Sequence, residues 1–140
     1  MLFTPAQERA LAALCDCLIP PDNFPGAWQA GAGDYITRLL DTDCTYLQDT
    51  YRLGLESLDA EATAHHAKVF SEITGEEQTA LLTHIEEGKV VANWLVSPQP
   101  TFNMWVHHVA ESYYSDSGNG GNHGNRSWEM IGYEIQGEQK

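Results

Sequence analysis

The sequence predicts an all-α fold: one compact helical domain, residues 1–140, of about five helices with a long ordered loop rich in glycine and asparagine near the C-terminus. Apolar residues recur at intervals of three and four along most of the chain, the periodicity of helices with one buried face. No alternating strand pattern is present at any length. The chain is long enough to bury one hydrophobic core and too short for a second, so a single domain is expected.

The first helix is expected over Pro5–Leu18. Thr4 and Gln7 have the spacing of a capping box, and proline is favoured at the first helical position. Pro20 and Pro21 lack backbone N–H donors and end the helix. The residues of its buried stripe are Leu11, Leu14 and Leu18.

The second helix is short and follows an irregular crossing. Residues 20–33 hold three prolines and three glycines around Phe24 and Trp28, which predicts a loop held down by two aromatic side chains. Helical spacing resumes at Asp34, which suits a cap or the acidic first turn. The apolar positions that follow are Tyr35, Ile36, Leu39 and Leu40.

The third helix is expected over about Thr45–Asp59, with an extension toward His65. Gly54 lies within it although glycine disfavours helix interiors. The apolar stripe steps by four, four and three residues: Leu47, Tyr51, Leu55 and Leu58.

The fourth helix begins at a second capping box, from Thr74 to Glu77, and ends at Gly88, with Leu81, Leu82 and Ile85 as its core face. The apolar run Val90–Val96 is too short to distinguish helix from strand by periodicity, and the helical context favours a helix. Residues 97–100 contain two prolines and break this run. A fifth helix then carries residues toward the loop at helical spacing: Phe102, Trp105, Val109 and Tyr113.

Charge excludes several classes of partner. Seven Lys and Arg stand against twenty Asp and Glu, a formal charge of −13, which repels phosphate backbones and anionic lipid surfaces. Nucleic acid is therefore not expected as a partner. The acidic residues are interpreted as an ordinary solvated surface in preference to a surface that attracts a basic partner protein. No window approaches the roughly 20 apolar residues of a membrane helix, so no membrane insertion is expected.

Cys15, Cys17 and Cys44 lack metal-site spacing and are interpreted as reduced thiols. One disulfide, from Cys44 to either of the other two, remains an alternative if the protein works outside the cytoplasm.

Candidate catalytic groups are sparse. His107 and His108, with Glu111 one turn later, suggest a small stand-alone metal-binding enzyme, but neighbouring helical residues point about 100° apart and no H-E-x-x-H pattern is present. Surface or capping histidines are the favoured interpretation. No serine lies in a nucleophile elbow, and the glycine spacing matches no nucleotide-binding motif, so we predict no catalytic residue and no metal or cofactor in this chain.

The glycine- and asparagine-rich stretch is the least generic part of the chain. Between Ser115 and Ser127 there is no aliphatic residue, so the stretch is expected to be a long shaped loop. Aromatic and aliphatic residues flank it and can anchor it: Tyr113, Tyr114, Trp128, Met130, Ile131 and Tyr133. A cover for the chain's own core and a protein-docking surface are equally compatible with this composition.

The same stretch resembles the gluconate 2-dehydrogenase subunit 3 family in Tyr114-Ser115-Asp116, Gly120-Gly121-Asn122 and the segment 128–133. Further pieces that resemble the family occur in the family's order: Thr4-Pro5-Ala6-Gln7 with Leu18-Ile19-Pro20, Gly26, Ala30-Gly31, Asp34-Tyr35-Ile36, Leu39-Leu40, Tyr51-Arg52, Gly54-Leu55 and Leu58-Asp59. The resemblance spans nearly the whole chain. The docking residues hypothesised on this basis are Tyr113, Tyr114, Asp116, Gly120, Gly121, Asn122, Trp128, Met130, Ile131 and Tyr133.

The resemblance implies a non-catalytic small subunit of a sugar, sugar-acid or glycoside dehydrogenase complex. In such complexes the redox chemistry belongs to an FAD-carrying partner of the glucose-methanol-choline flavoprotein type, sometimes with a cytochrome c subunit, and the small subunit supports folding, stability and export of that partner. Many members carry a twin-arginine export signal that is not visible here, so a cytoplasmic location is expected as the sequence stands, with a periplasmic one if a signal was removed or the partner carries it. A free-standing interaction module is the remaining alternative.

Overall fold

The computed structural model describes residues 2–21 and 25–115. Five α-helices form its frame: α1 (Pro5–Leu18), α2 (Ala32–Asp41), α3 (Gln48–His66), α4 (Gly75–Glu86) and α5 (Pro98–Ser115). Two short 3-10 helices, η1 (Thr45–Leu47) and η2 (Phe70–Glu72), precede α3 and α4. These residues contain no strand, so the predicted all-α fold is confirmed. None of their helices is long and apolar enough to cross a membrane.

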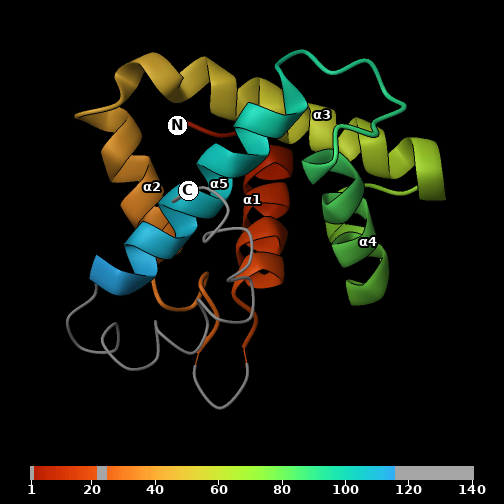
Figure 1. Ribbon diagram of the computed structural model, residues 1–140. Coiled ribbons are helices and arrows are strands. Elements are labelled where there is room, and N and C mark those ends of the chain that lie inside the picture. The colour runs from red at the N-terminus through yellow and green to blue at the C-terminus, as the bar shows by residue number, and fades with distance from the viewer. Residues whose placement is uncertain (1, 22–24, 116–140) are drawn as a thin grey trace.

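Helices α1 and α5 lie at the centre of the molecule. Each of them contacts the other four helices, whereas α2 and α4 lie on opposite sides of this pair (Figure 1). Helix α3 runs across one end and packs on α1, α4 and α5. The core between them is apolar and fully buried, with Leu14 from α1, Ile36 from α2, Leu55 and Leu58 from α3, Ile85 from α4 and Trp105 from α5.

Both predicted capping boxes are present. The backbone N–H of Gln7 donates to Thr4 Oγ1 at 3.1 Å, and Gln7 Oε1 accepts from the Thr4 N–H at 2.9 Å. Thr74 and Glu77 repeat the arrangement with the same two distances. Each box satisfies N–H groups that the first turn leaves without a helical partner, so α1 begins at the predicted residue and α4 follows its cap directly.

Helices α2 and α3 differ from prediction at their ends. Helix α2 begins at Ala32 after Gly31, whose φ of 103° lies in the left-handed region, so Asp34 is a first-turn acid and not the cap. Residues 45–47 form the 3-10 turn η1 instead of the start of the third helix, and α3 then extends to His66.

The expectation of a helix over Val90–Val96 is wrong. Residues 89–97 have no regular secondary structure, because the backbone N–H groups of Val91, Ala92 and Leu95 bond to side chains of α3 instead of to a helix of their own. The prolines that follow were expected to precede the fifth helix, but α5 begins at Pro98, so both lie in its first turn, where an N–H is dispensable.

Two other irregular segments are held by carboxylates of neighbouring helices. Asp16 of α1 accepts the backbone N–H of Trp28 at 3.2 Å, and Asp59 of α3 accepts that of Phe70 at 3.0 Å. Trp28 lies against Gly33, where an added Cβ would come within 2.5 Å of the indole ring. The predicted crossing between α1 and α2 is therefore held by Trp28; Phe24 lies outside the described residues.

Gly54 marks a close approach between α3 and α5. A Cβ at this position would come within 2.9 Å of Trp105 Cζ2 and 3.0 Å of Thr101 Cγ2. The glycine is thus required by packing, although it lowers the helix propensity of α3.

Gly54→Ala is expected to destabilise the protein by about 1–3 kcal/mol through overpacking, opposite in sign to the gain of about 1 kcal/mol that helix propensity alone predicts. Urea denaturation measures the difference. Gly75→Ala is the matched control, because no atom lies within 4 Å of a Cβ added there. A stabilised Gly54→Ala variant would refute the packing explanation.

Candidate docking surface

Of the ten residues predicted for docking, two fall among the described residues. Tyr113 and Tyr114 lie in the last turn of α5, and the other eight, from Asp116 to Tyr133, lie outside the described part of the chain. Tyr113 is 1% exposed, and its hydroxyl donates to the backbone oxygen of Pro25 at 2.8 Å. Its side chain therefore ties the end of α5 to the segment between α1 and α2, which fixes where the chain leaves the helix.

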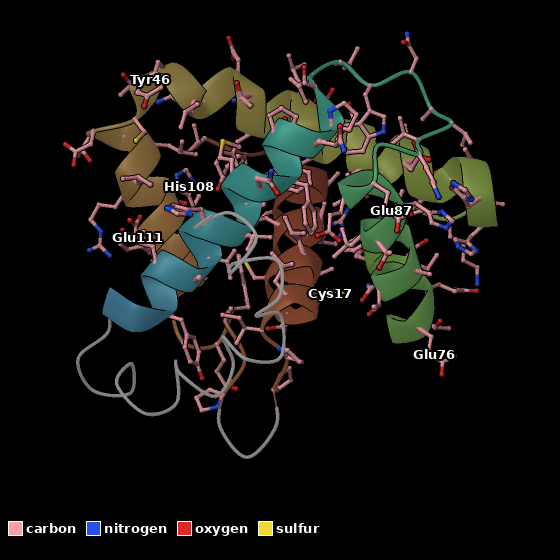
Figure 2. The ribbon with its side chains drawn as sticks, in the orientation of Figure 1. Cys17, Tyr46, Glu76, Glu87, His108 and Glu111 are labelled. Carbon is pink, nitrogen blue, oxygen red and sulfur yellow. The ribbon has the colours of Figure 1, made fainter. Side chains whose placement is uncertain are left out.

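The residues of the alternative metal site are engaged elsewhere. His108 Nδ1 and the hydroxyl of Tyr51 lie 2.8 Å apart and share a hydrogen bond, and their rings stack with centroids 5.8 Å apart. Glu111 Oε1 accepts the hydroxyl of Tyr35 at 2.9 Å. Figure 2 shows His108 and Glu111 along the same stretch of α5. Across residues 2–21 and 25–115, no group of three or more His, Cys, Asp and Glu side chains is placed to hold a metal ion.

Burial favours the neutral form of both groups in the contact between Tyr51 and His108. Burial lowers the pKa of His108 below its ordinary value of 6.5; Glu111 acts in the opposite direction and His107 in the same one. Burial also raises the pKa of Tyr51 well above 10. The pair thus acts as a packed hydrogen-bonded link between α3 and α5.

The thiols are unpaired in the described structure. Cys15 is buried in α1, and burial, with a smaller contribution from Asp16, raises the pKa of its thiol far above the ordinary value. Burial also raises the pKa of Cys17, although its Sγ lies 3.7 Å from Thr79 Oγ1. Both thiols of the α1 pair are therefore protonated, as expected for cysteines in an apolar helix.

A cavity of about 160 Å³ lies where α1 meets the start of α2. Its lining includes apolar side chains, Phe3, Leu11 and Trp28, and two carboxylates, Glu8 and Asp34. Ligand pockets usually enclose about 300–1,000 Å³, so this cavity suits a small group better than a dinucleotide.

A buried carboxylate on α3 is held by several hydrogen bonds. The Glu61 side chain is fully buried, and its carboxylate accepts four hydrogen bonds. Oε2 accepts from the backbone N–H of Val91 at 2.8 Å and lies 3.0 Å from His65 Nε2, while Oε1 accepts from the Ala92 N–H and from Trp94 Nε1, both at 2.9 Å. Burial raises the pKa of Glu61, but these bonds together outweigh it and hold the pKa below its ordinary value of 4.5.

A second buried group of α3 completes this attachment. Ser57 Oγ accepts the backbone N–H of Leu95 at 3.1 Å and donates to the Leu53 oxygen at 2.8 Å. The Trp94 ring lies against Trp105 of α5, with centroids 6.4 Å apart. Residues 88–97, named here the α4–α5 segment, are therefore fastened to α3 and α5 at successive points.

Two large apolar side chains of this segment are exposed, and they alternate along the chain with the exposed polar residues Lys89, Asn93 and Ser97. Val91 is 66% exposed and Leu95 55% exposed, and with Tyr46, 76% exposed, they are the exposed large hydrophobic side chains of the described residues. Sequence reasoning missed this surface because it assigned the segment to a helix. One signal was available: Glu61 lies three residues after Leu58, so a carboxylate continues the buried stripe of α3.

Comparison with known proteins adds the family. A model of the family described as gluconate 2-dehydrogenase subunit 3 matches residues 5–137. The chain belongs to this family. The resemblance predicted from the sequence is thereby confirmed. No curated protein and no solved structure matches the chain.

The family description makes this chain a subunit of a dehydrogenase assembly. The match runs from the first helix through the glycine- and asparagine-rich stretch, so all ten predicted docking residues of this subunit 3 chain lie within it.

Glu61→Gln is expected to destabilise the protein by about 2–4 kcal/mol, since the new NH₂ group faces N–H donors that lose their acceptor. The folded-state pKa of Glu61 is lowered, so its stabilising contribution is complete above pH 4.5 and is lost as the pH falls through the folded-state pKa. The difference from wild type should therefore shrink on acidification. Urea denaturation at several pH values measures it, with the exposed Glu76→Gln as control; equal costs for the two variants would contradict the assignment.

His108→Gln is expected to weaken the pH dependence of stability. Because the folded-state pKa of His108 is lowered, the unfolded chain binds the proton first, so stability is complete above about pH 6.5 and falls as the pH drops below it. Denaturation midpoints at about pH 7.5 and 5.5 lie on either side of the ordinary histidine pKa of about 6.5. An unchanged decrease in the variant would show that His108 does not contribute.

Proposed function

We propose that this chain is the non-catalytic small subunit of an FAD-dependent sugar, sugar-acid or glycoside dehydrogenase complex. It binds a catalytic subunit of the glucose-methanol-choline flavoprotein type and supports the folding and stability of that subunit. The observation that carries the proposal is the family match over residues 5–137, which places the chain among subunits of a dehydrogenase.

Several features of the described residues support an accessory role. The polar side chains that sequence reasoning considered for chemistry, among them His108 and Glu111, make contacts between helices. Buried polar groups such as Glu61 and Ser57 hold loops in place. This arrangement suits a chain whose task is to present shaped surfaces to another protein.

The C-terminal residues Asp116, Gly120, Gly121, Asn122, Trp128, Met130, Ile131 and Tyr133 form the proposed docking element, with Tyr114 before them. Tyr113 contributes by holding the end of α5 against Pro25. Aromatic anchors of this kind dominate the binding energy of protein interfaces.

Trp128→Ala or Gly121→Val is expected to weaken the complex with the flavoprotein about tenfold or more, because each change removes or displaces an anchor at the interface. The isolated chain should keep its helical circular dichroism and its melting temperature. The measurement is co-purification with the tagged chain, quantified by the flavin absorbance and sugar-dehydrogenase activity that it brings, with Gly75→Ala as control.

Three outcomes separate the alternatives. Full retention of the complex in both variants refutes docking by this element. Unfolding of the isolated variants favours a cover for the chain's own core. Stoichiometric metal with sugar oxidation by the wild-type chain alone favours the small metal-binding enzyme.

A further inference from the structure

The α4–α5 segment displays two apolar side chains at a place where the fold also fixes the backbone. Val91 and Leu95 are four residues apart, and each is more than half exposed. The backbone N–H of Val91 bonds to Glu61 at 2.8 Å and that of Leu95 bonds to Ser57 at 3.1 Å. Both acceptors are buried on α3. The two exposed side chains therefore belong to residues whose backbone N–H groups are hydrogen-bonded to buried side chains of α3.

The other two connections held by helix carboxylates use one backbone N–H each, whereas Glu61 and Ser57 together accept three from this segment. Burying a carboxylate is costly unless several donors compensate. Here a carboxylate with no exposed surface holds a segment that exposes two aliphatic side chains, one on each side of Asn93 in the chain. Trp94, next to Leu95 in the chain, donates to Glu61 and packs on Trp105. Such preorganisation lowers the entropy lost when a surface binds a partner.

The surroundings of the segment indicate the kind of partner. Glu86 and Glu87 come directly before it, and Lys89 pairs with Glu87 at 3.4 Å. The chain carries a formal charge of −13, so two copies meeting here would bring like charges together. A surface with an apolar recess and a neutral or basic rim complements the segment better than a second copy does.

We propose that Val91 and Leu95 form a second docking point for the catalytic flavoprotein subunit, which receives them in an apolar recess with a neutral or basic rim. This inference rests on the proposed function and adds to it a contact that is separate from the C-terminal element. The buried Glu61 and Ser57 preset the backbone, and the two aliphatic side chains supply the contact area.

The test uses the full chain with the flavoprotein subunit that co-purifies with it, identified by mass spectrometry and flavin absorbance and then co-produced with each variant. The double variant Val91→Ser, Leu95→Ser keeps both backbone N–H groups and both hydrogen bonds to α3. The affinity of the complex is expected to fall about tenfold or more. The melting temperature of the isolated chain should not change, because both side chains face solvent.

Tyr46→Ser is the matched control. Tyr46 is the third exposed large hydrophobic residue and lies in η1, next to the start of α3 (Figure 2). Glu61, which holds the segment, lies in the second half of that helix. This variant should bind the flavoprotein with wild-type affinity. Equal binding by the double variant and wild type overturns the proposal.

Other occupants of the segment give distinct results, and each would overturn the proposal. A wild-type dimer that the double variant dissociates, measured by light scattering, identifies a second copy. A lower melting temperature of the isolated double variant identifies a cover from the same chain. Absence of any flavoprotein with the wild-type chain refutes the proposed function and this inference together, whereas loss of binding in Trp128→Ala alone refutes only the inference.

Discussion

The buried Glu61 carboxylate is the interaction on which the rest of the structure depends. It joins α3 to residues 30 and more positions later in the chain through two backbone N–H groups and one indole N–H. The indole belongs to Trp94, which packs on Trp105 in the centre of α5. A single side chain therefore connects the path between α4 and α5 to the core, and the start of α5 follows from where this path is held.

Three helix carboxylates show how the number of donors decides the sign of a pKa shift. Asp16 and Asp59 each accept one backbone N–H, from Trp28 and Phe70, and burial still raises the pKa of both. Burial also acts to raise the pKa of Glu61, but its four hydrogen bonds outweigh burial and its pKa is lowered. Some of the many Asp and Glu side chains of this chain therefore hold the segments that connect its helices. In each case a helix provides the carboxylate, and an irregular segment provides the N–H groups.

Local signals in the sequence predicted local structure well. The capping boxes, the prolines and the apolar stripes located the helices because each signal acts within a few residues of its own position. The α4–α5 segment could not be predicted in this way, since its hydrogen-bond partners lie on α3 and periodicity within residues 90–96 carries no trace of them. Gly54 is similar, because its reason is Trp105, 51 positions along the chain. His108 also finds its partner Tyr51 at a separation of 57 residues.

The same distinction, between signals within a few residues and contacts far along the chain, applies to the proposed docking residues. The C-terminal element was predicted from composition, since glycines between aromatic residues are unusual in a plain helical domain. Val91 and Leu95 have no such signature: in sequence they resemble core residues, but both are exposed in the structure, where their backbone N–H groups bond to Glu61 and Ser57. In the proposed docking role, an accessory subunit would gain from this design because a partner would meet a surface that is already ordered. The energy that holds this surface comes from polar contacts beneath it, so the apolar side chains above remain available for binding.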